Sequence, residues 1–209
     1  MTSNKTVFFI IGTLLIILGF FMLIPYGVQL FYKENSHSFL SSSFITIFVG
    51  VLFVLANLQE KYQLNLKQTF LFSTFTWIAV ALFGSIPFAL SDLNFSLSDS
   101  FFESMSGITT TGSTVITDLD KSPKSILMWR AIMQWLGGVG IIVMAITVLP
   151  LLKVGGMQLF KIESSDKPEK ILPRAIQVAF IIISTYIILT LFCAFFYKIL
   201  GMSIFDSIA

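Results

Sequence analysis

The chain has 209 residues, of which 56% are hydrophobic and 11% are charged, and its formal net charge is +2. Its mean hydropathy is +0.89. Soluble domains carry about 25% charged residues, so this composition excludes an ordinary soluble protein and indicates an integral membrane protein. The small net charge and the scattered bases argue against a nucleic-acid partner. The single cysteine, Cys193, excludes an intrachain disulfide.

Five apolar stretches are long enough to cross about 30 Å of hydrocarbon as helices, which predicts an all-α polytopic membrane protein. They are Val7–Phe31, Phe39–Leu58, Thr69–Leu90, Ser125–Leu152 and Pro173–Leu200. The first stretch exceeds the roughly 7 to 15 residues of a secretory signal core, so we interpret it as a retained membrane helix. Pro25 is expected to bend this helix near its outer end. Trp129 is expected to mark the outer interface of the fourth span.

Lysine and arginine positions predict a cytoplasmic N-terminus, because cytoplasmic loops are enriched in these residues. This orientation leaves five of them outside: Lys33, Lys121, Lys124, Arg130 and Lys198. Eight lie inside: Lys5, Lys61, Lys67, Lys153, Lys161, Lys167, Lys170 and Arg174. Seven of the 11 acids then face outward, either as a vestibule that concentrates cations or as ordinary solvated loops.

A polar segment between the third and fourth spans has the composition of a cation-coordinating loop. Thr109–Thr114 reads TTTGST, which places backbone carbonyls and hydroxyls close together, and Gly112 permits backbone angles that a side chain would forbid. Potassium filters coordinate the ion with carbonyl oxygens of such loops. The candidate ion-binding residues are therefore Thr109, Thr110, Thr111, Gly112 and Ser113, with K⁺ held through Thr110, Thr111 and Gly112. The competing interpretation is an ordinary solvated loop.

The preceding residues are predicted to form a pore helix, whose negative C-terminal end would point at the ion. Ser98–Ile108 has eleven residues, which is too short to span a bilayer. A Ser-x-x-Glu pattern at Ser100 and Glu103 predicts its start as a capping box. With the N-terminus inside, this segment enters from outside as a re-entrant loop, and non-helical backbone at membrane depth must line a protein or water-filled cavity.

The end of the chain echoes the pore segment and predicts an internal repeat. Phe205–Ile208 (FDSI) matches Phe102–Met105 (FESM) in character, at an offset of 103 residues. One unit of span, pore helix, loop and span is complete, and a second stops before its own filter. One segment cannot form a ring of carbonyls. Either several chains assemble, or, as the interrupted repeat favours, this is the N-terminal part of a longer protein.

Four motifs together resemble the Trk/Ktr/HKT potassium-uptake superfamily, and within it the bacterial TrkH/TrkG branch. They are FFESMSGITTTGST (101–114), LMWR (127–130), QWLGGVGI (134–141) and GGMQLF (155–160). The resemblance implies four repeats in one polypeptide around a single pore. It divides this chain into two N-terminal transmembrane helices (1–60), a first M1–P–M2 pore repeat (61–155) with its filter at 109–114, a cytoplasmic loop (156–172), and the M1 helix and pore-helix start of a second repeat (173–209).

The resemblance also implies a function. It is potassium transport by the translocating (pore) subunit of a Trk-type uptake system in the bacterial inner membrane, with K⁺ as the transported ion and no covalently bound cofactor. The implied partners are the lipid bilayer, a TrkA-like nucleotide-binding regulatory subunit on the cytoplasmic side, and a second copy in a homodimer of the full-length protein. The alternative hypothesis is a non-conducting, truncated membrane fragment with a structural role. An enzyme is not supported, because the sequence offers no His/Glu metal cluster and no Ser/His or Cys/His pair.

The fourth span carries further polar and small residues. Gly137, Gly138 and Gly140 lie in an apolar helix, which favours close helix packing over a dinucleotide-binding loop. Gln134 is expected to hydrogen-bond either a neighbouring helix or the back of the filter loop. Arg130 is expected to anchor a loop or the interface rather than to repel ions.

Overall fold

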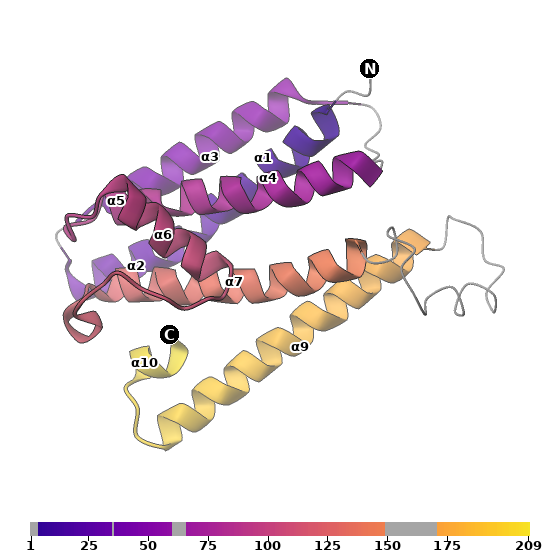
Figure 1. The fold of residues 1–209 in the computed structure, drawn as a ribbon. Coiled ribbons are helices and arrows are strands. Elements are labelled where there is room, and N and C mark those ends of the chain that lie inside the picture. The colour runs from indigo at the N-terminus through magenta and orange to yellow at the C-terminus, as the bar shows by residue number, and fades with distance from the viewer. Residues whose placement is uncertain (1–3, 35, 60–65, 149–170) are drawn as a thin grey trace. The chain divides into compact units, whose positions relative to one another are not determined.

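The computed structural model describes residues 4–34, 36–59, 66–148 and 171–209, and the long regular elements in these ranges are all helices (Figure 1). Five helical stretches are long and apolar enough to cross a membrane, which confirms the predicted all-α polytopic fold. The chain divides into two compact units, Met1–Gly137 and Gly138–Ala209, and each is described by itself. The predicted cytoplasmic loop at 156–172 falls almost entirely outside the described residues.

The first unit begins with a helical hairpin of α1 (Lys5–Phe21), α2 (Leu23–Tyr32) and α3 (Ser38–Ala56). The first predicted span is therefore two helices, which meet at Met22. The interruption lies three residues before Pro25, because a proline has no N–H to donate to the carbonyl four residues earlier and its ring collides with that carbonyl. Pro25 thus coincides with a break in the helix at Met22, where a bend was expected.

Small residues allow α1 and α3 to pack closely. A Cβ atom built at Gly50 would lie 2.8 Å from the carbonyl oxygen of Gly12, and one built at Gly12 would lie 2.8 Å from the carbonyl oxygen of Gly50. Nearby, the Ser43 hydroxyl donates a 2.7 Å hydrogen bond to the carbonyl of Gly19. Glycine and serine at the crossing let the two backbones approach, as is common between membrane helices.

The segment predicted to form the pore repeat follows, in the same unit as far as Gly137. It comprises α4 (Leu66–Gly84), α5 (Ile86–Ala89), α6 (Leu97–Ile108), a 3-10 turn (Leu119–Lys121) and α7 (Lys124–Val148). The third span was expected to be a single helix. It is instead interrupted just before Pro87, in the first turn of α5. The reason is the same as at Pro25: a proline cannot donate the hydrogen bond that would continue the helix.

The start of α6 differs from the prediction. Ser96 is its N-cap: the Ser96 hydroxyl accepts a 3.1 Å hydrogen bond from the amide of Asp99, and the Asp99 carboxylate accepts a 3.2 Å bond from the amide of Ser96. This is a complete capping box. The predicted box at Ser100 and Glu103 is wrong, because both side chains lie within the helix and are buried.

Trp129 does not mark a lipid interface as predicted. Its side chain is fully buried, its indole N–H donates a 2.9 Å hydrogen bond to the carbonyl of Gly84, and its ring meets Phe39 edge to face with centroids 6.1 Å apart. It joins α7 to α4 and α3 within the first unit. A tryptophan with a satisfied N–H is well suited to such an interior position.

The second unit contains the end of α7, α9 (Ile171–Ile199) and α10 (Ile204–Ile208). Gly201, with a φ of 103°, lies in the turn between α9 and α10. Ser203 caps α10: its hydroxyl accepts a 3.1 Å hydrogen bond from the amide of Asp206 and donates a 2.6 Å bond to the Asp206 carboxylate.

This cap corrects the register of the predicted repeat. Ser203 and Asp206 have the same arrangement as Ser96 and Asp99 at the start of α6. Positions 96 and 203, like 99 and 206, are 107 residues apart. The offset of 103 paired Asp206 with Glu103, which lies in the interior of α6 and caps nothing. We therefore pair Asp206 with Asp99.

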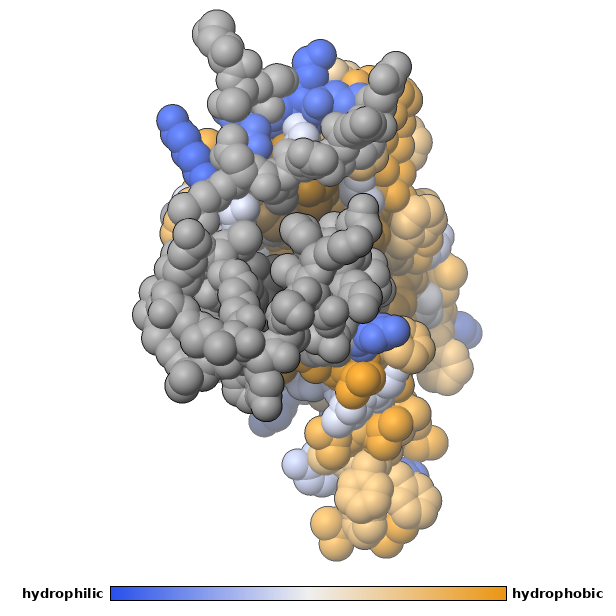
Figure 2. Space-filling model, turned by 90° about the vertical axis from the view of Figure 1, so that its right-hand side faces the viewer, coloured by the Kyte–Doolittle hydropathy of each residue, from blue (hydrophilic) through white to orange (hydrophobic). Residues whose placement is uncertain are grey.

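Hydrophobic side chains cover much of the described surface that Figure 2 shows. Large apolar residues are strongly exposed on several membrane-length helices, among them Phe44 on α3 and Phe180, Leu191 and Phe195 on α9. Exposed apolar surface on this scale is unusual for a soluble protein and agrees with a lipid environment.

Candidate ion-binding site

The segment after α6 is held by its backbone amides. Four consecutive N–H groups turn back and donate to carbonyls of the last turn of α6, over donor–acceptor distances of 2.9 to 3.4 Å. The pairs are Thr109 to Met105, Thr110 to Gly107, and both Thr111 and Gly112 to Ser106. These bonds also satisfy carbonyls that the end of a helix would otherwise leave unpaired.

The carbonyl oxygens of the same segment are left free. Within the described residues, no hydrogen-bond donor reaches the carbonyls of Thr110, Thr111 or Gly112, and all three residues are exposed. The φ angles are −83° at Thr109, 57° at Thr110 and 78° at Gly112, and those of Thr111 and Ser113 are negative. In a regular strand successive peptide groups point to opposite sides. This alternation in the sign of φ instead allows successive carbonyls to face one side.

The two ends of the candidate set have partners inside the protein. The Thr109 hydroxyl donates to the Met105 carbonyl at 2.7 Å and lies 2.9 Å from the Thr111 hydroxyl. The carbonyl of Ser113 accepts a 2.6 Å hydrogen bond from the Ser106 hydroxyl. All five predicted residues thus lie in one continuous segment, and within the described residues the Thr109 carbonyl, like those of the three residues predicted to hold K⁺, accepts no hydrogen bond. That they bind an ion stays a prediction.

Glu103 fixes the non-helical strand of chain, residues 113–118, that leaves the candidate site. Its carboxylate accepts hydrogen bonds from the Thr114 hydroxyl at 2.9 and 3.1 Å and from the Val115 amide at 3.0 Å, and it forms an ion pair with Arg130 of α7. The residue as a whole is 1% exposed. Arg130 therefore anchors a loop, as predicted, through a partner that the sequence did not identify.

The role of Glu103 was missed in the sequence, where it was interpreted as part of a helix start. A signal was present: acids and bases within membrane segments are rare and usually pair with one another. Glu103 and Arg130 both lie in the segment from the pore helix to the fourth span. Pairing them would have predicted the anchor.

The middle of α7 packs directly against the end of α6. A Cβ atom built at Gly137 would lie 1.9 Å from the carbonyl oxygen of Ile108, the last residue of α6. One built at Gly107 would lie 3.0 Å from the Cβ atom of Met133. Close helix packing, the predicted role of the glycines in this span, is confirmed for Gly137. Gln134 makes no hydrogen bond within the described residues, so neither of its predicted contacts is supported.

Comparisons with known proteins identify the family. The family model described as "TrkH: Cation transport protein" matches residues 35–206. The chain belongs to the TrkH family. This agrees with the expectation of a transporter rather than an enzyme.

Several known proteins are similar along nearly the whole chain. The Trk system potassium uptake protein TrkH of Vibrio parahaemolyticus is 38% identical over an alignment of 209 positions, which covers 98% of this chain and 43% of that protein. The Escherichia coli K12 protein of the same name is 38% identical, covering 95% of this chain and 42% of that protein. An uncharacterized cation transporter of Methanocaldococcus jannaschii is 36% identical, with 95% and 41% covered.

A solved structure has the same fold. The crystal structure of the potassium transporter TrkH from Vibrio parahaemolyticus superposes with a TM-score of 0.86 at 35% sequence identity, covering 99% of this chain and 42% of that one. The TrkH-family chain thus spans less than half the length of these relatives.

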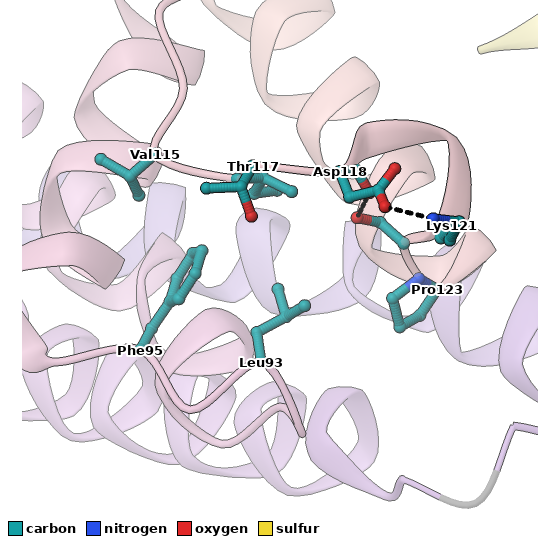
Figure 3. Close-up of a pocket in the computed structure, with 9 residues that line it drawn as sticks. Leu93, Phe95, Val115, Thr117, Asp118, Lys121 and Pro123 are labelled. Atoms are coloured by element: carbon teal, nitrogen blue, oxygen red, sulfur yellow. Dashed lines mark hydrogen bonds and ion pairs between the residues drawn. The ribbon is translucent and has the colours of Figure 1, made fainter.

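Two further features lie near the candidate site in this TrkH-family chain. Glu34, which follows α2, accepts hydrogen bonds from the amide, at 3.2 Å, and the hydroxyl of Ser125 in the first turn of α7. Beside the strand after the candidate site lies an open hollow of about 250 Å³, where Leu93 and Phe95 point toward that strand (Figure 3). The carboxylate lining it, Asp118, is already paired with a lysine at 2.7 Å, so we do not assign the hollow as a cation site.

Proposed function

We propose that this TrkH-family chain is part of the potassium-translocating pore subunit of a Trk-type uptake system. In this proposal, ions shed water at the carbonyls of Thr110, Thr111 and Gly112, and Thr109 and Ser113 complete the segment. The negative end of α6 faces the ion. The chain supplies one filter segment, and the other segments of the ring come from further sequence or from further copies.

One observation carries the proposal: a row of exposed carbonyls without donors, beside amides that are all tied to α6. Leaving backbone carbonyls unpaired at membrane depth costs several kcal/mol per group, unless water or a ligand satisfies them. A cation is a ligand that can be bound by carbonyl oxygens without any N–H donors. The relatives include potassium uptake proteins, which supports K⁺ as that cation.

The proposal extends to the setting of the full-length protein. We infer a bacterial inner-membrane location with a cytoplasmic N-terminus, from the excess of lysine and arginine on that side. A TrkA-like nucleotide-binding subunit on the cytoplasmic side and a homodimer are the partners implied by the resemblance. Copurification of the full-length protein with such a subunit, and its mass in detergent, test these two points.

The experiment compares two glycines with the same backbone constraint. Gly112 and Gly201 both have positive φ, and a Cβ atom would meet nothing within 4 Å at either position. Gly112→Ala and Gly201→Ala therefore carry similar conformational costs, about 1–2 kcal/mol each. In the full-length protein, expressed in cells without other potassium uptake systems, we expect Gly112→Ala to lower rubidium uptake about tenfold or more, and Gly201→Ala to leave it near wild type.

A stronger substitution gives the decisive result. Gly112→Arg adds a positive charge where the ion would bind, so it should abolish uptake at an unchanged level of protein in the membrane. Full uptake by this variant would show that the segment is not the filter. The 209-residue chain expressed alone tests the alternative: insertion without rubidium flux is expected of a non-conducting fragment, whereas rescue of growth would mean that copies assemble a complete pore.

A further inference from the structure

Three segments of the first unit meet at the carboxylate of Glu103. Its Oε1 atom accepts from Thr114 and Arg130, and its Oε2 atom accepts from Thr114 and the Val115 amide. Glu103 belongs to α6, Arg130 to α7, and the other two residues to the non-helical strand of chain that leaves the filter segment. The carboxylate is therefore the point at which the pore helix and the following span are both tied to this strand.

The burial of the pair makes each partner depend on the other. The side chain of Glu103 is 0% exposed and that of Arg130 is 14% exposed. Removing one partner of a buried ion pair is strongly destabilising, because the remaining charge is left uncompensated in a medium of low dielectric constant. Glu103 can keep its position next to the strand only while Arg130 compensates the negative charge of its carboxylate.

We propose that Glu103, held by Arg130, is a positioning residue that sets the discrimination between K⁺ and Na⁺ at the filter segment. This inference rests on the proposed function. The strand is restrained at Thr114 and Val115, directly after the free carbonyls, and on the other side the amides of that segment are tied to α6. Carbonyls restrained at both ends cannot close around the smaller Na⁺, whereas release of one end would allow them to do so.

A purely structural role makes a different prediction. If the pair only stabilised the fold, its variants would reduce the amount of protein in the membrane, and the molecules that remain would keep the wild-type ratio of sodium to potassium permeability. The ratio, measured per conducting protein, separates the two roles, because it is independent of how much protein inserts.

The experiment uses the full-length protein in liposomes, with potassium and sodium permeabilities measured on the same sample. In Glu103→Gln, one acceptor oxygen becomes an N–H₂ donor, so the amide cannot satisfy Val115, Thr114 and Arg130 together. We expect the sodium-to-potassium permeability ratio to rise about tenfold, the size typical of a lost charge-assisted hydrogen bond. Thr114→Val removes the hydroxyl that bonds Glu103 and accepts from the Ile116 amide but keeps both charges, and it should raise the ratio by a smaller factor.

A matched control is available in the same loop. Asp118 pairs with Lys121 at 2.7 Å, but its side chain is 54% exposed, so Asp118→Asn removes a carboxylate–cation pair that contributes little. The ratio should stay at the wild-type value in this variant. If Glu103→Gln does not reach the membrane, Thr114→Val gives the deciding ratio.

The outcomes are distinct. Wild-type ratios in Glu103→Gln and Thr114→Val, alongside normal potassium flux, would overturn the positioning role while leaving the proposed function intact. An equal rise of the sodium-to-potassium permeability ratio in Asp118→Asn would also overturn the positioning role. In that case the loss of any charge in the loop would be enough to change the ratio. Absence of potassium flux from the wild-type protein would instead overturn the proposed function, and with it this inference.

Discussion

The contact between Gly137 and the end of α6 leads to a sharp prediction for Gly137→Ala. The added Cβ atom would lie 1.9 Å from the oxygen and 2.7 Å from the carbon of the Ile108 carbonyl. Ordinary van der Waals contacts of a Cβ atom begin at 3.4 Å. Both partners are helix backbone, which cannot rotate away as a flexible side chain can. One helix must therefore move by about 1.5 Å, the difference between 1.9 and 3.4 Å.

This displacement acts on the residue that immediately precedes the candidate filter. Overpacking of a tight contact typically costs about 1–3 kcal/mol. If that cost is expressed as misplacement of the Thr110–Gly112 carbonyls, transport should fall about 5- to 150-fold, the factors that correspond to this range of free energy. We expect the loss to appear in rubidium uptake at saturating expression of the full-length protein, with membrane levels measured in parallel.

Gly140→Ala is the matched control on the same helix. A Cβ atom at Gly140 would meet nothing within 4 Å of the described structure, and alanine is the better helix former. Uptake should therefore equal or exceed that of the wild type. The reasoning is refuted if Gly137→Ala transports normally at normal abundance, or if the two alanine variants lose uptake to the same extent.

Two further predictions concern stability, measured as the unfolding temperature of the purified full-length protein. Trp129→Phe leaves the buried Gly84 carbonyl without its 2.9 Å donor, which should cost about 1–3 kcal/mol and lower that temperature; an unchanged value would mean that water replaces the indole. Gly50→Ala places a methyl group 2.8 Å from the Gly12 carbonyl oxygen and should lower it through about 1–3 kcal/mol of overpacking, whereas Gly27→Ala, in open space, should not.

Much of the fold was predictable because it depends on length and polarity alone. The five spans follow from apolar runs that match the bilayer thickness, and the interruption of the first span follows from the missing N–H of Pro25. The end of α6 at Ile108 was also predicted, because the Thr/Gly/Ser segment after it has poor helix propensity.

The start of α6 could not be chosen from local sequence. Both Ser96-x-x-Asp99 and Ser100-x-x-Glu103 fit a capping pattern. The choice depends on Arg130, which lies 27 positions after Glu103 and draws this carboxylate into the interior. Asp99 is then the acid that remains at the helix start. The wrong repeat register has the same origin, since it matched Asp206 to the buried acid rather than to the capping one.

Trp129 shows a second limit of the sequence. Hydropathy and a position near the end of a span do not distinguish a lipid-facing tryptophan from one that faces other helices. The distinction depends on α3 and α4, which bring Phe39 and the Gly84 carbonyl to the indole. Such contacts between distant segments also place Gly137 against Ile108, and no local pattern specifies them.

The row of free carbonyls at Thr110, Thr111 and Gly112 has a consequence for how the protein is held together. Under the proposed function, the oxygens that no protein donor satisfies are satisfied by the cargo, so the ion in transit is also part of the folded structure. A ligand that binds only the native state stabilises it in proportion to the logarithm of its concentration. The native state of the transporter would then be most stable at high potassium concentrations. It would be least stable at the low concentrations at which uptake is most needed.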